Sequence, residues 1–450
     1  MTARSLGFCL LWLAACKDHE VACTVVADPA QPLVTHVTWD AGVAGASTLD
    51  FSWAEGSGAG RMTQVGTAND AAIVGVPPLE DVAFEAVTRA GKQTWTCEGS
   101  TRTGNLPTET PTFLVTVDVP ERRSPEGFLV GSLITGTDSP MFVVDREGRF
   151  RWIAGAAPDR LVVMAAPALD GGLIDVSFAR LWALRDGALH RRDLVSDDTE
   201  PEPVPRIHHV FRELPDRSLL YLKLDVRDAM VGGVVQPVAG DSVVQRTPDG
   251  EDRVLFSTWD HLAIRDEIED FQAFYPEGLD WVHGNALFYV ESRDTVLYSM
   301  ANVRTVVEFD RETGAVVRSF RGGDDWTLDG DDYTVASGER FRLQHDAHYD
   351  AAGNLVVFAT NDVTANTGAH VYAIDDVNHT LSEVWSHVPD PPLRNWAIGQ
   401  VQELSNGDRL IAFPVVGVLQ EVTPDGEVVW EVHTPINVAF GQVYLRDDLP

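Results

Sequence analysis

The sequence is poor in cysteine, in basic residues and in long apolar runs. Its 450 residues include four cysteines, and 34 Lys and Arg stand against 68 Asp and Glu, giving a formal net charge of -34. Phosphate-neutralising surfaces need clustered Lys and Arg, so this balance argues against nucleic-acid binding. No segment after the first residues approaches the ~18 consecutive apolar residues of a membrane-spanning helix. The 44% hydrophobic content is ample for a folded core.

The N-terminus has the pattern of an export signal. Arg4 supplies a positive start, and the apolar run at 6–15 is too short to span a bilayer. The run ends in Leu13-Ala14-Ala15-Cys16, which resembles the lipobox of bacterial lipoproteins. By that resemblance residues 1–16 form the signal, and Cys16 is lipidated and anchors an exported protein to a bacterial membrane, on its periplasmic face or at the cell surface. The alternative is an ordinary signal peptide with an unmodified cysteine.

The remaining cysteines predict one disulfide. Cys9 and Cys16 belong to the leader, which leaves Cys23 and Cys97. In an exported chain two such residues most simply pair, and the absence of a CxxC spacing disfavours a redox or metal pair.

Residues 17–107 predict a small β-sandwich domain of the fibronectin type III or immunoglobulin kind. Short alternating strands are expected at 33–39, 49–53, 82–87 and 93–97, separated by Gly- and Ser-rich turns. We expect this domain to act as a spacer or to form a homodimer contact. Residues 108–125, rich in proline, predict a linker.

Residues 126–450 predict a six-bladed β-propeller. One turn chemistry, an Asp followed by Gly or Asn before an apolar strand, recurs along this region and marks hairpins. Repeated four-stranded units of this kind are typical of propellers, whereas a second sandwich would not explain six similar units. The runs 286–290, 295–299, 305–309 and 315–320 predict the four strands of one blade, and 261–274 is the one helix expected. The six turns begin at Asp145, Asp186, Asp249, Asp310, Asp375 and Asp425.

Three histidine sites stand ahead of predicted strands. His345 precedes a glycine turn and the apolar run at 355–358, His283 precedes the run at 286–290, and the pair His208 and His209 precedes the run at 219–222. In a repeating all-β chain, such sites can converge on one centre.

The motifs around these histidines resemble those of the bacterial arylsulfate sulfotransferase family, of which the chain looks like a divergent lipoprotein member. The matching pieces include Asp280-Trp281-Val282-His283-Gly284-Asn285 and Gln344-His345-Asp346-Ala347, and the likeness spans roughly 128–430. The resemblance implies an exported six-bladed propeller with a small N-terminal β domain and no cofactor. It also implies transfer of a sulfuryl group from an aryl sulfate to a phenol through a sulfated histidine, without the nucleotide donor PAPS.

The same resemblance assigns the site residues. His345 would be the nucleophile, with His283 and either His209 or His208 beside it; His209 is favoured because it stands nine residues ahead of Ser218, as His345 stands nine ahead of Asn354. A neutral imidazole is a competent nucleophile, and protonated histidines can stabilise the sulfuryl oxygens. The predicted substrate-binding residues are Asn285, Trp281, Gln344 and Asn361.

One departure from the family pattern bears on activity. Family members carry an arginine on the strand after the Trp-x-His motif, where this chain has Ala301. Arg304 is three residues on, which places it on the opposite face of a strand; Arg340, Arg342 and Arg394 are further candidates for the missing charge. The alternative function is therefore a propeller that has lost transfer chemistry and binds a ligand or a protein.

Metal binding is a further alternative that the sequence leaves open. Three histidines could bind zinc, but no His-x-His or His-x3-His spacing occurs among the principal motifs, so no metal is predicted there. The acidic loop at 324–332 could hold calcium, although its spacing does not match an EF-hand and a solvated loop is the simpler interpretation.

Overall fold

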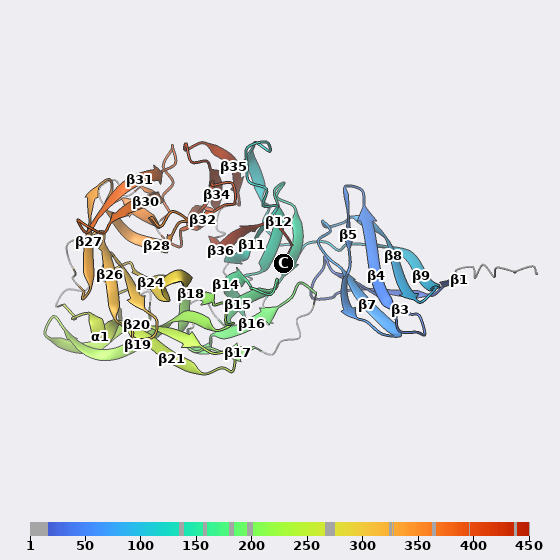
Figure 1. Cartoon of the computed structure of the whole chain (residues 1–450), viewed down its shortest axis with the longest axis horizontal. Helices are drawn as coiled ribbons and strands as arrows, with labels where there is room; N and C mark the ends of the chain where they lie inside the picture. The colour runs from blue at the N-terminus through green and yellow to red at the C-terminus, as the bar shows by residue number, and fades with distance from the viewer. Residues whose placement is uncertain are drawn as a thin grey trace, which may run out of the picture. The chain divides into compact units, whose positions relative to one another are not determined.

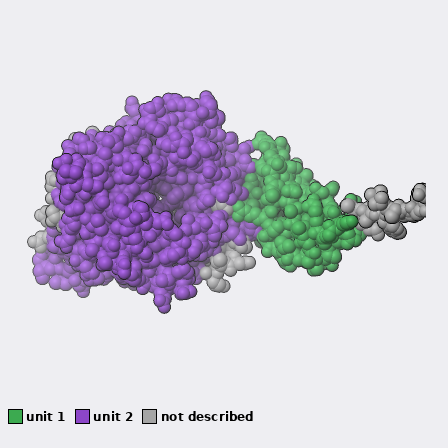
Figure 2. Space-filling model, in the orientation of Figure 1, with its two compact units in different colours: residues 1–107 green, residues 108–450 purple. Residues whose placement is uncertain are grey.

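The structure, a computed structural model, divides the chain into two compact units, residues 1–107 and 108–450 (Figure 2). The predicted leader, with Cys16, lies outside the described residues. The described residues are 17–134, 139–155, 160–179, 184–195, 201–265, 275–323, 326, 328–361, 366–395, 397–435 and 439–449.

Unit 1 contains two β-sheets packed face to face, as the strand pattern predicted. Alternating residues of its strands, such as Val82, Phe84 and Ala86, point into a shared apolar core. The predicted disulfide between Cys23 and Cys97 is present, with a Cα–Cα distance of 5.8 Å, and it joins a strand of one sheet to a strand of the other. One sheet is β1 (Lys17–Glu20), β9 (Gln93–Arg102), β8 (Asp81–Ala90), β4 (Ala46–Trp53) and β5 (Gly56–Ala59); the other is β2 (Cys23–Ala27), β3 (Thr35–Asp40), β7 (Ala68–Ile73) and β6 (Arg61–Gln64).

Unit 2 is the predicted six-bladed β-propeller, with blades arranged around a central axis (Figure 1). Blade 1 is β36 (Ala439–Arg446), β11 (Phe128–Ile134), β12 (Met141–Asp145) and β13 (Phe150–Ala154). Blade 2 is β14 (Leu161–Pro167), β15 (Leu173–Phe178), β16 (Ala188–Arg192) and β17 (Glu202–Pro203). Blade 3 is β18 (Ile207–Glu213), β19 (Leu219–Val231), β20 (Val234–Arg246) and β21 (Asp252–Ser257), and β22 (Leu279–Asp280) pairs with β20.

The second half of the ring repeats this plan and adds a bridge between two blades. Blade 4 is β23 (Gly284–Val290), β24 (Thr295–Met300), β25 (Thr305–Asp310) and β26 (Val316–Arg321). Blade 5 is β28 (Phe341–Tyr349), β29 (Leu355–Asn361), β30 (Thr367–Asp375) and β31 (Thr380–His387), and β27 (Asp331–Ser337) pairs with both β26 and β31. Blade 6 is β32 (Gln400–Glu403), β33 (Arg409–Phe413), β34 (Val418–Val422), β35 (Val428–His433) and β10 (Leu114–Asp118). Short helical turns are α1 (Thr258–His261), η1 (Leu184–Asp186), η2 (Glu291–Arg293) and η3 (Pro414–Val416).

The recurrent turn marks the same place in five of the six blades. It joins the third strand to the fourth in blades 1, 3, 4, 5 and 6, but the turn at Asp186 in blade 2 joins the second strand to the third. The helix expected at 261–274 is wrong where the structure describes it, because α1 ends at His261 and 262–265 are not helical; 266–274 lie outside the described residues.

Apolar clusters between successive blades hold the ring together. The cluster shared by blades 3 and 4 includes Val243 and Phe256 from one blade and Leu287 and Tyr298 from the next. Blade strands are thus covered on both faces, which explains why they read as continuous apolar runs. The first strand of each blade lies innermost, beside the first strand of its neighbours, and a hollow is visible near the centre of unit 2 (Figure 2).

The predicted linker at 108–125 is wrong, because part of it belongs to the propeller. β10 pairs antiparallel with β35 and completes blade 6, while the C-terminal β36 pairs with β11 and completes blade 1. Both ends of unit 2 therefore contribute to closing the ring.

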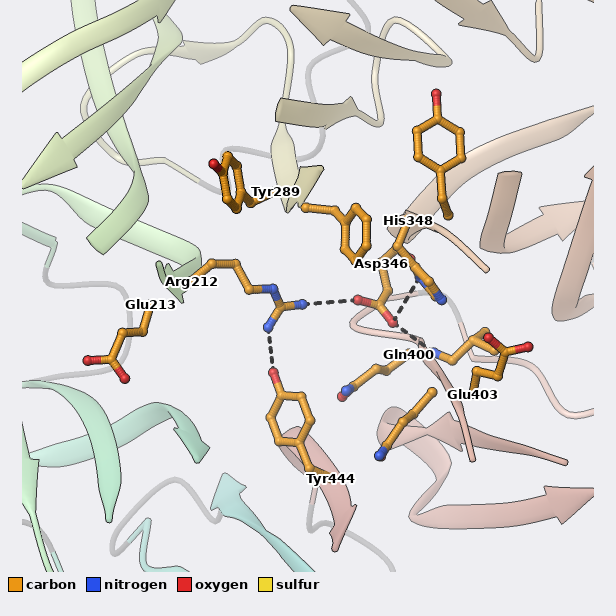
Figure 3. A pocket seen from close by; sticks show the side chains of 12 residues that line it. Arg212, Glu213, Tyr289, Asp346, His348, Gln400, Glu403 and Tyr444 are labelled. Atoms are coloured by element: carbon orange, nitrogen blue, oxygen red, sulfur yellow. Dashed lines mark hydrogen bonds and ion pairs between the residues drawn. The ribbon is translucent and has the colours of Figure 1, made fainter. Parts of the chain in front are cut away.

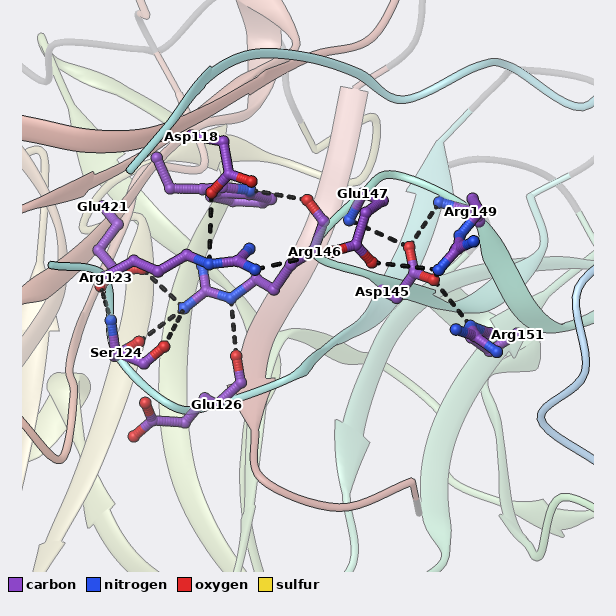
Figure 4. A network of polar contacts seen from close by, with 11 residues as sticks. Asp118, Arg123, Ser124, Glu126, Asp145, Arg146, Glu147, Arg149, Arg151 and Glu421 are labelled. Atoms are coloured by element: carbon purple, nitrogen blue, oxygen red, sulfur yellow. Dashed lines mark hydrogen bonds and ion pairs between the residues drawn. The ribbon is translucent and has the colours of Figure 1, made fainter. Parts of the chain in front are cut away.

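A buried polar network joins the first blade to the last (Figure 4). Arg146, in the turn after β12, donates to the carbonyl of Glu126 at 2.7 Å and to Ser124 Oγ at 2.6 Å. Its guanidinium lies 2.7 Å from the carboxylate of Glu421 on β34 and 4.9 Å from the ring centre of Trp430 on β35. Arg146 of blade 1 thus connects the segment that precedes β11 with strands β34 and β35 of blade 6.

Candidate active site

A small cavity of about 40 Å³ lies between the innermost strands of the propeller. It is lined by residues of β18, β23, β28, β32 and β36 or of the turns that precede them, so five of the six blades contribute. Its polar lining consists of His209, Asn285, His345, Asp346, Gln400 and Gln442. The ring topology therefore brings together side chains that are far apart in the sequence.

Left-handed backbone conformations aim side chains into this centre. His209, His283, Asp346 and Ile398 have φ of 54°, 50°, 49° and 60°, each at or just before the innermost strand of a blade. The pairing register of β18 and β28 shifts at the same places, as expected of bulges that redirect side chains. Non-glycine residues with positive φ have a strained backbone, and such residues concentrate at functional sites.

The predicted nucleophile, His345, faces the cavity. Its residue is 8% exposed, and no described residue forms a side-chain hydrogen bond or ion pair with its imidazole. Burial and the neighbouring charge of His283 lower the pKa of His345 to about 3. The ring is therefore neutral at physiological pH and available for chemistry.

His208 and His209 have different surroundings. His209 lines the cavity, whereas His208 is buried behind it with Nε2 3.1 Å from Asp241 Oδ1. The Tyr275 hydroxyl lies 3.1 Å from Nδ1 of His208 and 3.3 Å from Nδ1 of His209, which links the two rings. Burial and the charges of His283, His208 and His345 lower the pKa of His209 well below its ordinary value.

His283 is paired with a buried carboxylate. Its Nδ1 lies 2.5 Å from Asp280 Oδ2, and its ring centre is 4.7 Å from that of His209. Burial alone would lower the pKa of His283, but the charge and hydrogen bond of Asp280, with the charge of Asp241, raise it. His208, His209, His283 and His345 are called the channel histidines. Pairing with Asp280 favours a proton on His283.

Asp241 fixes the backbone between these histidines. Its Oδ2 accepts from the Gly284 amide at 2.7 Å and from the Tyr298 hydroxyl at 2.9 Å. A Cβ on Gly284 would lie 2.5 Å from both the Asp241 carboxylate and the Tyr298 hydroxyl, so this approach requires glycine. Burial would raise the pKa of Asp241, but His208, the Gly284 amide and Tyr298 lower it overall.

The predicted substrate-binding residues fall in different places. Asn285 lines the cavity, donates its amide to the Gln344 carbonyl at 2.7 Å, and has a buried Oδ1 without a partner among the described residues. Gln344 points away and donates to the carbonyls of Met300 at 2.9 Å and Thr305 at 3.2 Å, so its side chain connects blades 5 and 4. Trp281 is buried against Trp259 in the core and does not line the cavity. The side chain of Asn361 lies outside what the structure describes.

Ala301, where the resemblance predicts an arginine, supplies no charge in the structure. Ala301 is buried, and its amide donates to the His283 carbonyl at 3.1 Å. The arginines considered as substitutes do not line the described cavity around His345, and two of them, Arg340 and Arg394, are exposed. Among the residues that the structure describes, the cavity lining contains no Lys or Arg.

A second, larger cavity of about 480 Å³ lies further along the same inner strands (Figure 3). Arg212 lines it, and its guanidinium donates to Asp346 Oδ1 at 3.3 Å and to the Tyr444 hydroxyl at 2.6 Å. Asp346 also accepts from the Val401 amide at 2.9 Å. The Asp346 carboxylate lines both cavities and is held by Arg212 and Val401.

Sequence reasoning missed the carboxylates and tyrosines behind the histidines. Asp280 stands three residues before His283 in a motif already noted, so that pairing carried a local signal. Tyr275 was a candidate for an aromatic pocket, but its contacts with His208 and His209 were not predicted. Asp241 and Tyr298 carried no signal. No group of three or more His, Cys, Asp or Glu in the described chain is arranged to hold a metal ion, and the calcium alternative at 324–332 lies partly outside the described residues.

The comparison with solved structures finds matches of low sequence identity. They include a Bacteroides caccae protein of unknown function (13% identity, 71% of this chain and 98% of that chain, TM-score 0.43) and the Staphylococcus aureus virginiamycin B lyase (9% identity, 73% and 89%, TM-score 0.36). At these TM-scores the likeness carries no functional argument. No described helix is long and apolar enough to span a membrane.

Family membership rests on the sequence. None of the curated proteins compared with the chain matches it. The family described as Arylsulfotransferase (ASST), in contrast, matches residues 118–437, which is well over half of the chain and nearly all of the propeller. The chain therefore belongs to the arylsulfotransferase family, and its function is of the aryl sulfotransferase type.

Proposed function

We propose that the protein is an exported enzyme that moves a sulfuryl group from an aryl sulfate to a phenol, with His345 as the covalent carrier and without PAPS. The observation that carries this proposal is the state of His345. Its imidazole lines the central cavity, is neutral at physiological pH, and forms no side-chain hydrogen bond with a described residue. The other three histidines of the cluster are held by carboxylates or by Tyr275.

The proposed reaction has two balanced halves. In the first, an imidazole nitrogen of His345 attacks the sulfur, the nitrogen–sulfur bond forms, and the bond from sulfur to the aryl oxygen breaks. The proton that the imidazole loses ends on the departing phenolate, with His209 at the cavity as the relay. In the second half an acceptor phenol attacks the sulfur of sulfohistidine, its proton returns to the imidazole, and the nitrogen–sulfur bond breaks.

The surrounding groups suit a transfer of this kind. Sulfuryl transfer should resemble phosphoryl transfer, in which positioning and stabilisation of charge on the non-bridging oxygens supply most of the rate. The Asn285 side chain at the cavity wall offers a polar contact to the substrate, and His283 offers a cation.

The test uses purified protein lacking residues 1–16, incubated with 4-nitrophenyl sulfate and then with excess phenol. We expect release of 4-nitrophenol and formation of phenyl sulfate. A brief reaction without acceptor should leave a sulfuryl-sized mass increase on the peptide containing His345. Turnover with the adduct on another residue would contradict the assignment of His345.

A second function is favoured by the uncharged residue at Ala301. A propeller without transfer chemistry would bind a ligand or a protein partner through the same channel. No phenol release with several aryl sulfate donors, together with no adduct on His345, would favour that function over the enzyme.

Export and anchoring are proposed on the sequence alone. We expect fatty-acid label to enter the protein during expression in a bacterial host and to be lost in Cys16→Ser. Label that persists in the variant would place the lipid elsewhere, and absence of label in the wild type would favour an ordinary signal peptide.

A further inference from the structure

The negative charge of a bound sulfuryl group needs a cation for compensation, and the described residues of the cavity lining include no Lys or Arg. The polar lining of the described cavity consists of two histidines, Asn285, two glutamines and Asp346, with no Lys or Arg. Arg212 does not line this cavity, and its charge is already compensated by Asp346, to which it donates at 3.3 Å. The histidine cluster is therefore the candidate source of a positive charge for the sulfuryl group.

Within that cluster the buried carboxylates are placed unevenly. Asp280 is fully buried and lies 2.5 Å from His283 Nδ1. Its position is fixed on both sides, since β22 pairs with β20 and the Asp280 carbonyl accepts from the Asn302 amide at 2.9 Å. A buried carboxylate is costly unless a cation or several donors compensate it, so this geometry favours protonated His283.

The groups packed around His283 from other elements decide which ring is charged. His209 on β18 lies 4.7 Å away between ring centres, and Tyr275 lies 6.0 Å away. Asp241 on β20 adds negative charge, whereas His345 on β28 competes for the same proton. Ala301, after β24, contributes only its backbone amide to the His283 carbonyl. Neighbouring imidazoles cannot all be charged at once, and a ring that faces a carboxylate is favoured to keep its proton. His283 faces Asp280 and His208 faces Asp241, whereas His209 lies beside the Tyr275 hydroxyl and no carboxylate pairs with the ring of His345 among the described contacts.

We infer that Asp280 is a positioning residue that keeps His283 positively charged, and that this imidazolium balances the charge of the sulfuryl oxygens during transfer to His345. This inference rests on the proposed function and assigns Asp280 a part in it. Nδ1 of His283 is engaged by Asp280, and the His283 ring centre lies 4.7 Å from that of His209, which lines the cavity. The division of roles then follows, with His345 and His209 neutral and His283 charged.

The inference predicts a pH dependence with a defined sign. Asp280 raises the pKa of His283 above its ordinary value of 6.5. The imidazolium is therefore fully present below that ordinary value and is lost as pH rises through the raised pKa. His345 is neutral throughout this range, since its pKa is about 3. Activity should fall as pH rises because His283 loses its proton and its positive charge. His345 stays unprotonated, and so able to attack sulfur, until the pH falls to near its pKa of about 3.

Asp280→Asn tests this, because asparagine keeps the shape and can still accept the Nδ1 hydrogen bond but removes the charge. We expect the alkaline limb of kcat/KM for 4-nitrophenyl sulfate to move down by about one pH unit or more, which is about a tenfold loss at pH values above the limb. Glu383→Gln is the matched control: Glu383 lies 3.2 Å from His370 in blade 5, outside the described cavity lining, and its loss should leave the limb in place. An unmoved limb in Asp280→Asn with intact turnover would overturn the inference and leave the proposed function standing.

A second measurement does not depend on turnover or on the variant folding. NMR titration of the full-length histidine signals should show His283 with a pKa above 6.5 in the wild type, and a value below 6.5 would overturn the inference. Binding of benzenesulfonate, which cannot transfer its sulfur group, should weaken at least about tenfold as pH rises through the His283 titration. If that binding follows His283 but no aryl sulfate turns over, the proposed function fails and the charge assignment stands; pH-independent binding would overturn the assignment.

Discussion

His345→Ala is expected to reduce aryl sulfate turnover by at least about a thousandfold and to eliminate the sulfuryl adduct. The imidazole forms the new bond to sulfur in the proposed first half-reaction. His209 also lines the cavity, but its Nδ1 lies 3.3 Å from the Tyr275 hydroxyl and it serves as the proposed proton relay. His208 is held against Asp241, and His283 is held against Asp280 and charged. Steady-state release of 4-nitrophenol and mass analysis of the quenched protein measure the two effects.

The loss must be separated from unfolding. His345 forms no side-chain hydrogen bond with a described residue, so the alanine variant should keep the wild-type circular dichroism spectrum and melting temperature within a few degrees. His433→Ala, at a half-exposed histidine on β35 far along the chain from the cluster, controls for the general effect of removing an imidazole. A folded His345→Ala protein with near-normal turnover would exclude the covalent role.

Much of this architecture could be predicted from the sequence because it depends on local patterns. The four strands expected in blade 4 match β23 to β26 to within two residues at each end, since apolar alternation and turn chemistry are local. Convergence of the histidines follows from topology: His209 and His345 lie within the inner strands β18 and β28, His283 directly precedes the inner strand β23, and a closed ring brings these strands together.

The side-chain directions could not be predicted in the same way. A regular strand alternates its faces, but β28 has register shifts on both sides of His345 and left-handed residues at Leu343 and Asp346. These bulges send Gln344 between blades and His345 into the cavity, which a period of two does not predict. Trp281 was predicted to bind substrate as an aromatic residue of the pocket, yet it packs in the core against Trp259.

Contacts between distant segments account for the remaining differences. β10 lies more than 300 residues from β35, and no local signal at 114–118 identifies its partner. Asp241 reaches His208 and Gly284 only because β18, β20 and β23 meet at the channel. The sequence therefore indicates which blades exist, and tertiary pairing decides which polar groups stand behind the histidines.

Arg146→Ala is expected to lower the free energy of unfolding of unit 2 by about 3–5 kcal/mol. The substitution leaves the fully buried Glu421 carboxylate without its cation and removes the guanidinium contacts to Ser124, Glu126 and Trp430. Because these groups lie where the first blade meets the last, the loss should act on ring closure. Urea unfolding followed by tryptophan fluorescence measures it, and Arg102→Ala, at an exposed ion pair in unit 1, is the control.

The double variant Arg146→Met with Glu421→Met tells charge compensation apart from packing. An ion pair taken out of water recovers little net free energy, and the main cost of Arg146→Ala is the uncompensated carboxylate. We therefore expect the double variant to be more stable than Arg146→Met alone, with a coupling free energy of about 1–3 kcal/mol. Additive losses in the two single variants would show that the two side chains act independently. In that case pairing of β10 with β35 and of β36 with β11 would be left as the principal closure of the ring.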